Sequence, residues 1–86
     1  MRWRLSRHAQ KEIQRRAIPV HLLQSVLERP QHIVPARSGR KAYQSQLRFD
    51  GDRLFLVRAI VNDTVDPPMV VTVYRTSKIA RYWRTS

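Results

Sequence analysis

The run of residues 54–61 constrains the fold of this chain more than any other stretch. Its eight residues, Leu-Phe-Leu-Val-Arg-Ala-Ile-Val, are apolar on both faces of an extended strand except for Arg58. A strand that is apolar on both faces belongs at the centre of a sheet. Asp50-Gly51-Asp52 joins it to the strand-like run 42–49, and Asp-Gly between two such runs is a strong hairpin signal, because glycine tolerates the positive φ of these turns. The sequence therefore predicts a hairpin whose second strand is central.

Arg58 places a permanent cation on this most buried strand. Burying a guanidinium without a partner is costly, so the side chain either pairs with a carboxylate or lines a groove that binds an anion. The chain has six Asp and Glu against seventeen Lys and Arg, of which fourteen are arginine, and its net charge is +11. Because carboxylates are so scarce, we expect Arg58 to line an anion-binding groove.

The first third of the chain predicts a short edge strand followed by two helices. Residues 3–5 alternate apolar and charged, as in a strand. Ser6 is a typical N-cap for a helix over 7–16. Pro19 suits the first position of a second helix, which ends at 28–30. The side of this helix that we expect in the core comprises Val20, Leu22, Leu23, Val26 and Leu27.

The remainder predicts four strands and a short final helix. Pro35 confines the first of these strands to a sheet edge or ends it. The strands are expected over 32–36, 42–49, 54–61 and 69–74, and the helix over 78–83. The resulting order, β-α-α-β-β-β-β-α, indicates an α+β fold with helices packed against an antiparallel sheet.

Size and composition limit the function classes. A chain of 86 residues predicts one domain over 1–86. No apolar run is long enough to span a bilayer, so no membrane association is expected. The absence of cysteine and of an apolar leader after Met1 favours the cytoplasm. The excess of arginine, whose planar fork suits phosphate, predicts a polyanionic partner, either nucleic acid or an acidic protein.

Metal and carboxylate chemistry find little support in the sequence. The three histidines share no ligand spacing and have no acidic cluster beside them, so neither a metal centre nor another cofactor is predicted. The aspartates fall in a turn and a loop, where Asp is common for turn geometry alone. We find no pair of carboxylates placed for general acid and base catalysis.

His8 is one candidate for proton transfer. It lies in the first turn of the first predicted helix, where the helix dipole disfavours the imidazolium and keeps the ring available as a neutral base. The alternative is a histidine that packs against the sheet and donates to a carbonyl.

Basic and tyrosine side chains form a second candidate set. The hairpin places Tyr43 and Arg58 on neighbouring strands, and Tyr74 is on a further strand, for which a place beside Arg58 is one arrangement. If they share a face, guanidinium groups can hold a phosphate while a tyrosine supplies a proton, and RNA brings its own 2′-OH nucleophile. The alternative is a solvated basic face with half-buried tyrosines. The full set is Arg40, Lys41, Tyr43, Arg58, Tyr74, Arg75 and Lys78.

The aromatic residues near the two ends have two interpretations. Trp3, Tyr82 and Trp83 could stack on nucleic-acid bases. For Trp83 we expect docking onto the sheet instead.

Several short motifs resemble an uncharacterised bacterial family of small basic proteins that is known only as a domain of unknown function. They are Ser6-x-His8-Ala9, Arg16-x-Ile18, Tyr43-Gln-Ser, Leu54-x-Leu-Val-Arg58 and Val71-Thr-Val-Tyr74-x-Thr-Ser-Lys-Ile. This family is similar to the BrnT toxins and, more distantly, to the RelE/ParE toxins. The resemblance implies a RelE-like fold, with two N-terminal helices on a curved antiparallel sheet and a short C-terminal helix. The chain departs from the family at Ala17, where a glycine is usual, and at Glu12, where a basic residue is usual.

The resemblance also implies a function. It suggests the toxin of a type II toxin–antitoxin system that acts on mRNA, either free or on the ribosome, and is silenced by an acidic antitoxin. Together with the absence of an expected metal site, this leads us to predict an endoribonuclease that needs no metal. Arg58 and Arg40 would hold phosphate, His8 or Tyr74 would move protons, and Lys78 would add charge. Alternatives are a gyrase-directed toxin of the ParE kind, a non-catalytic nucleic-acid binder or a toxin that has lost its activity.

Overall fold

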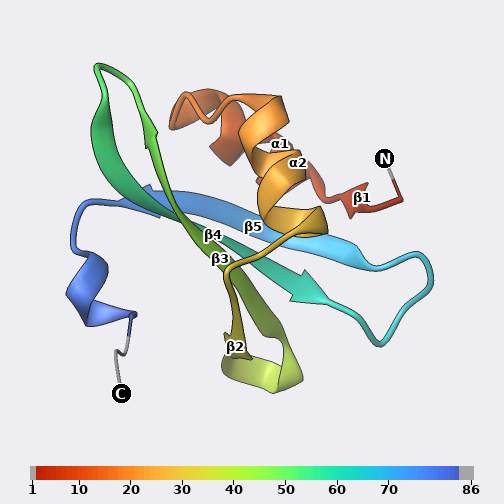
Figure 1. Cartoon of the computed structure of the whole chain (residues 1–86). Helices are drawn as coiled ribbons and strands as arrows, with labels where there is room; N and C mark the ends of the chain where they lie inside the picture. The colour runs from red at the N-terminus through yellow and green to blue at the C-terminus, as the bar shows by residue number, and fades with distance from the viewer. Residues whose placement is uncertain (1, 84–86) are drawn as a thin grey trace.

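One five-stranded sheet organises residues 2–83, which are the residues described by a computed structural model (Figure 1). Two helices lie on one face of the sheet, so the α+β architecture is confirmed. The elements are β1 (Arg4–Leu5), α1 (Arg7–Arg15), α2 (Val20–Glu28), β2 (His32–Pro35), a 3-10 turn (Arg37–Gly39), β3 (Lys41–Phe49), β4 (Arg53–Asn62), β5 (Met69–Thr76) and a second 3-10 turn (Ile79–Arg81).

The strand order is β1-β5-β4-β3-β2, which confirms that β4 is central and that β2 lies at an edge. The expectation of a wholly antiparallel sheet is wrong, because β1 runs parallel to β5. These two strands are far apart in the sequence, so no hairpin turn forces them to be antiparallel. The hydroxyl of Ser6 donates to the carbonyl of Val71 at 2.7 Å and fastens the chain where it leaves β1.

The β3–β4 hairpin is confirmed and sets the register of the central strands. Asp50, Gly51 and Asp52 all have positive φ, at 54°, 82° and 60°. From this turn the pairing runs unbroken from Phe49–Arg53 to Lys41–Val61. Side chains alternate between the two faces along each strand, so the turn decides which residues of β3 and β4 share a face.

The hydrophobic core lies between the helices and one face of the sheet. Val57, Ala59 and Val61 of β4 are fully buried there, beneath side chains of α1 and α2. Leu23, Val26 and Leu27 are buried as expected. Val20 is instead 59% exposed, because α2 packs on the sheet through its later turns and Val20 opens the first.

The C-terminal segment lies on the opposite face of the sheet from the helices (Figure 1). Of the short helix expected over 78–83, only a 3-10 turn over Ile79–Arg81 forms. The main-chain oxygen of Tyr82 accepts a hydrogen bond from Gln44 at 3.2 Å and is held at the sheet. Trp83 stacks on His32 with ring centroids 3.8 Å apart, which confirms its docking. Among residues 2–83, neither helix is long and apolar enough to cross a membrane.

The two ends of α1 are closed in different ways. Ser6 is the N-cap, as expected, and its hydroxyl accepts from the backbone N–H of Ala9 at 3.0 Å. At the other end the N–H groups of Ala17 and Ile18 donate to the carbonyls of Gln14 and Ile13. This is the pattern of a Schellman motif, whose left-handed position is usually glycine. Here alanine occupies it with φ of 49°.

We expect Ala17→Gly to raise the free energy of unfolding by about 0.5–1 kcal/mol, measured by urea denaturation. Glycine removes the left-handed strain of an L-residue, and its greater entropy in the unfolded chain offsets part of that gain. Ala9→Gly is the matched control and should destabilise, because Ala9 is buried within the regular helix. A loss of stability in the Ala17 variant would contradict the assignment of strain.

Candidate functional site

Four side chains form a row across four strands, on the face of the sheet that the helices leave uncovered. Each is the register partner of the next along β2, β3, β4 and β5. In that order the residues are His32, Gln44, Arg58 and Tyr74. The face is therefore polar along one line, although β4 itself is an apolar strand.

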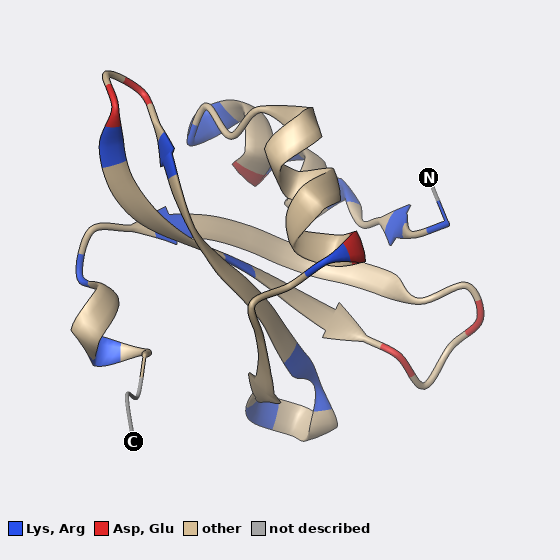
Figure 2. Ribbon diagram, in the orientation of Figure 1, with Lys and Arg blue, Asp and Glu red and all other residues tan. Residues whose placement is uncertain are grey.

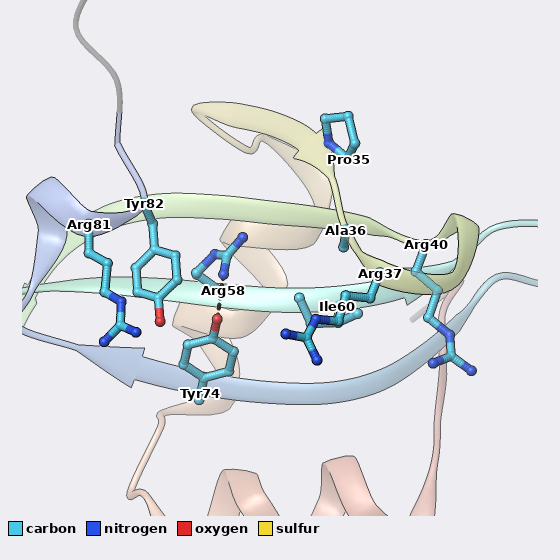
Figure 3. Close-up of a pocket in the computed structure, with 9 residues that line it drawn as sticks. All are labelled: Pro35, Ala36, Arg37, Arg40, Arg58, Ile60, Tyr74, Arg81 and Tyr82. Atoms are coloured by element: carbon cyan, nitrogen blue, oxygen red, sulfur yellow. Dashed lines mark hydrogen bonds between the residues drawn. The ribbon is translucent and has the colours of Figure 1, made fainter.

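Arg58 is the centre of this row. Its Nε donates to Oε1 of Gln44 at 2.8 Å, and its guanidinium donates to the hydroxyl of Tyr74 (Figure 3). The guanidinium carbon also lies 4.3 Å from the ring centroid of Tyr82. No carboxylate among residues 2–83 forms an ion pair with Arg58. Two of its five N–H donors are used in these bonds, and the others are available to an anion.

Arg58 and Tyr74 line a pocket of about 840 Å³ (Figure 3). Three further arginines come from the loop after β2 and from the C-terminal turn. The complete lining is Pro35, Ala36, Arg37, Arg40, Arg58, Ile60, Tyr74, Arg81 and Tyr82. These residues, which we call the arginine pocket, include no carboxylate and no histidine. A cluster of guanidinium groups without carboxylates is suited to bind phosphate.

The acidic residues lie away from this pocket (Figure 2). Asp50 pairs with Arg53 and Arg75, at 3.2 and 3.1 Å, and these two guanidinium groups lower the pKa of its carboxyl. Asp63 pairs with Lys41 at 2.7 Å, and this bond likewise lowers the pKa of the aspartate.

Glu12 is paired within α1, so it too is unavailable to the pocket. Its carboxylate contacts Arg15 and Arg16, each at 3.1 Å. The hydrogen bond from Arg16 is the main reason why the pKa of this carboxyl is lowered. Among residues 2–83, no group of three or more His, Cys, Asp and Glu gathers where it could hold a metal ion.

Gln44 is the residue that sequence reasoning missed. Its side chain is completely buried, and its two polar atoms join Arg58 to the main chain of Tyr82. A glutamine in a strand of mixed polarity does not look functional. Gln44 and Arg58 are, however, equally far from Gly51, and counting outward from the hairpin turn would have placed them opposite one another. Arg37 and Arg81 were also missed, since they follow from no periodic pattern. Tyr82 was considered only as an aromatic residue that could stack on bases.

Three predicted site residues meet in the arginine pocket: Arg40, Arg58 and Tyr74. Tyr43 does not share their face. Its register partner is Ala59, one residue from Arg58, so its ring lies on the helix side and packs edge-on against Trp3 at 5.5 Å.

The remaining predicted residues also lie elsewhere. Arg75 faces the helix side, where it pairs with Asp50 and lies 4.6 Å from the ring centroid of Phe55. Lys41 is engaged by Asp63, and Lys78 is exposed outside the pocket lining. His8 is exposed on α1, which packs on the opposite face of the sheet from Arg58.

The phenol of Tyr74 stays protonated at neutral pH. Its burial raises the pKa above the ordinary value of 10.0, although the neighbouring Arg58 charge and hydrogen bond act in the other direction. Because the Tyr74 oxygen accepts from Arg58, its own hydrogen points away from that guanidinium, toward the pocket and the neighbouring hydroxyl of Tyr82. The tyrosine can therefore donate a proton or a hydrogen bond to a bound anion.

Comparison with known proteins gives a family without an assigned activity. A family profile described as "Domain of unknown function (DUF4258)" matches residues 5–75. No curated protein and no solved structure matches the chain.

Tyr74→Phe should remove one tyrosine's share of the tyrosinate absorbance, and the loss should fall at the alkaline end of the titration, since burial raises the pKa of the Tyr74 phenol above 10.0. The measurement is a spectrophotometric titration of natural and variant chains. A Tyr74 signal that titrates below pH 10.0 would contradict the raised pKa.

Gln44→Glu should weaken the binding of inorganic phosphate about tenfold or more, because the new carboxylate would pair with Arg58 and neutralise it. An NMR titration with phosphate measures the effect. Gln46→Glu is the matched control, since it adds the same charge to the same strand outside the pocket lining. Equal weakening by both variants would indicate a general field effect and not a contact at Arg58.

Proposed function

We propose that this chain, which belongs to the family described as "Domain of unknown function (DUF4258)", is a type II toxin with a RelE-like fold. In this proposal it is an endoribonuclease that cleaves RNA in the arginine pocket without a metal. One observation carries the proposal: Arg58 is held by the neutral partners Gln44 and Tyr74, and the pocket around it is lined by other arginines but no carboxylate. The placement of α1 and α2 on one face of the sheet agrees with the fold that the resemblance implies.

The chemistry uses the 2′-OH of the RNA as the nucleophile. The arginines bind the phosphate that is to be cleaved, and the 2′-oxygen attacks its phosphorus. Arg58 stabilises the negative charge that grows on the phosphoryl oxygens. The bond from phosphorus to the 5′-oxygen breaks, and Tyr74 donates a proton to that leaving oxygen. The products are a 2′,3′-cyclic phosphate and a free 5′-hydroxyl. The proton of the 2′-OH passes to solvent, and the phenolate left on Tyr74 takes a proton back from solvent.

A partner follows from the same charge pattern. The net charge of +11 and the unpaired arginines of the pocket favour an acidic antitoxin, whose carboxylates would occupy the phosphate site and block RNA. The arginine pocket then serves both RNA binding and inhibition.

A second candidate function is a non-catalytic toxin or binder, directed at nucleic acid or at gyrase. The favouring observation is that the pocket lining contains no histidine or carboxylate to accept the 2′-OH proton. His8, the base expected from the sequence, belongs to α1, which packs on the other face of the sheet. In this case Arg58 binds phosphate and Tyr74 has no chemical role.

We expect induced expression in a bacterium to arrest growth and to cleave RNA, and Tyr74→Phe to slow cleavage roughly a hundredfold or more, the contribution of a general acid. Arg58→Ala should abolish both effects. His21→Ala is the control, because His21 is exposed on α2 outside the arginine pocket. Cleavage is followed by sequencing RNA ends and by assay of the purified chain.

The variants separate the two candidates once their folding is verified by circular dichroism. Arrest that survives Tyr74→Phe but not Arg58→Ala would favour the binding toxin. Arrest relieved by His8→Ala alone would move the chemistry to the helix face. No arrest from well-expressed natural protein would overturn the toxin assignment.

A further inference from the structure

A second hollow of about 700 Å³ adjoins the arginine pocket. The two hollows share Pro35, Arg58 and Tyr82. The rest of the second lining is contributed by residues 31–34, from the start of β2 and the residue before it. A ligand bound to Arg58 can therefore extend from the arginine pocket into a space of different chemistry.

The lining of the second hollow is much less charged. Arg58 is its one Lys or Arg, compared with four arginines in the arginine pocket. The other lining residues are Gln31, His32, Ile33, Val34, the shared proline and Tyr82. Of these, His32 and Val34 are in register with Gln44 and Ala42, so their side chains lie on the same face of the sheet as Arg58. Flat rings and aliphatic groups beside a guanidinium suit a planar aromatic ligand better than a second phosphate.

Contacts between distant parts of the chain hold this wall in place. Trp83 stacks on His32 with an interplanar angle of 16°, and Gln44 holds the main chain of Tyr82. Tyr82 in turn lies against the guanidinium of Arg58. The hollow is thus formed before any ligand arrives, and its shape depends on the same Gln44 that positions Arg58.

We propose that this second hollow, which we call the base hollow, binds an unpaired base of single-stranded RNA whose neighbouring phosphate is held at Arg58. The inference rests on the proposed function and names its substrate as single-stranded. Bases that are free of a duplex stack on aromatic side chains and on arginine planes, whereas the bases of an RNA duplex are paired and stacked on one another. The base hollow therefore selects single strands, and the arginine pocket supplies charge-dependent affinity.

The test compares two oligonucleotides that differ only in their bases. One is a short single strand of 2′-O-methyl RNA, and the other is its abasic counterpart with the same number of phosphates. The 2′-O-methyl group removes the nucleophile, so binding is measured without cleavage. We expect the natural chain to bind the abasic strand and the corresponding duplex about tenfold more weakly than the intact single strand.

Two variants address the base hollow independently. His32→Ala removes a ring from its wall, and Val34→Phe fills the space while keeping that ring. Each should weaken the intact strand about tenfold and leave the abasic strand unchanged. His21→Ala, on α2, is the matched histidine control. Arg37→Ala should instead weaken both strands and reduce the slope of log affinity against log salt by about 0.7.

Equal binding of intact and abasic strands by the natural chain would overturn the base hollow, as would a folded Val34→Phe variant that keeps the full difference between them. If Arg37→Ala weakened binding but neither variant of the base hollow did, the base hollow would be overturned and the phosphate site would still be supported. Base-dependent binding by a chain that neither arrests growth nor cleaves RNA would support the base hollow and overturn the catalytic proposal.

Discussion

The candidate site depends on one cation that the fold withdraws partly from water without giving it a carboxylate. Arg58 projects from the central strand, and its partners, Gln44 and Tyr74, are both neutral. Neutral acceptors orient a guanidinium but leave its charge intact, whereas a carboxylate would cancel that charge. The cost of holding the cation in place is met by burial of the core on the other face of β4. A fixed charge with free donors is a suitable first element of a phosphate site.

The alternation of side chains along the strands puts cations that form ion pairs on one face of the sheet and the arginines that can bind an anion on the other. The side chains of Lys41 and Arg75 lie on the helix side of the sheet, opposite to that of Arg58. On the helix side Lys41 pairs with Asp63, and Arg75 pairs with Asp50. On the side that the helices leave free, the arginines of the pocket meet no carboxylate among the described residues. With six acidic residues in the whole chain, this distribution decides where positive potential remains.

Much of the fold is predictable because its signals are local. The Asp-Gly turn, the apolar run of β4 and the Ser6 cap each depend on neighbouring residues, and each was identified correctly. The parallel pairing of β1 with β5 and the short C-terminal turn depend on contacts between residues far apart in the chain. No sequence period encodes such contacts, so the direction of β1 was predicted wrongly and the C-terminal helix was predicted too long.

The sequence by itself determined that the chain is strongly basic, that Arg58 lies on a central strand and that Tyr74 lies on another strand, because charge and strand period are properties of short segments. The pairing of β5 with β4, which puts Tyr74 beside Arg58, is a tertiary contact. Only the tertiary structure decided which of the other candidates join them. A register offset of one residue sends Tyr43 to the far face, and helix packing carries His8 away. The docked C-terminal turn brings Tyr82 and Arg81 into the pocket. These outcomes depend on how separate elements pack against both faces of one sheet, and that information is spread over the whole chain.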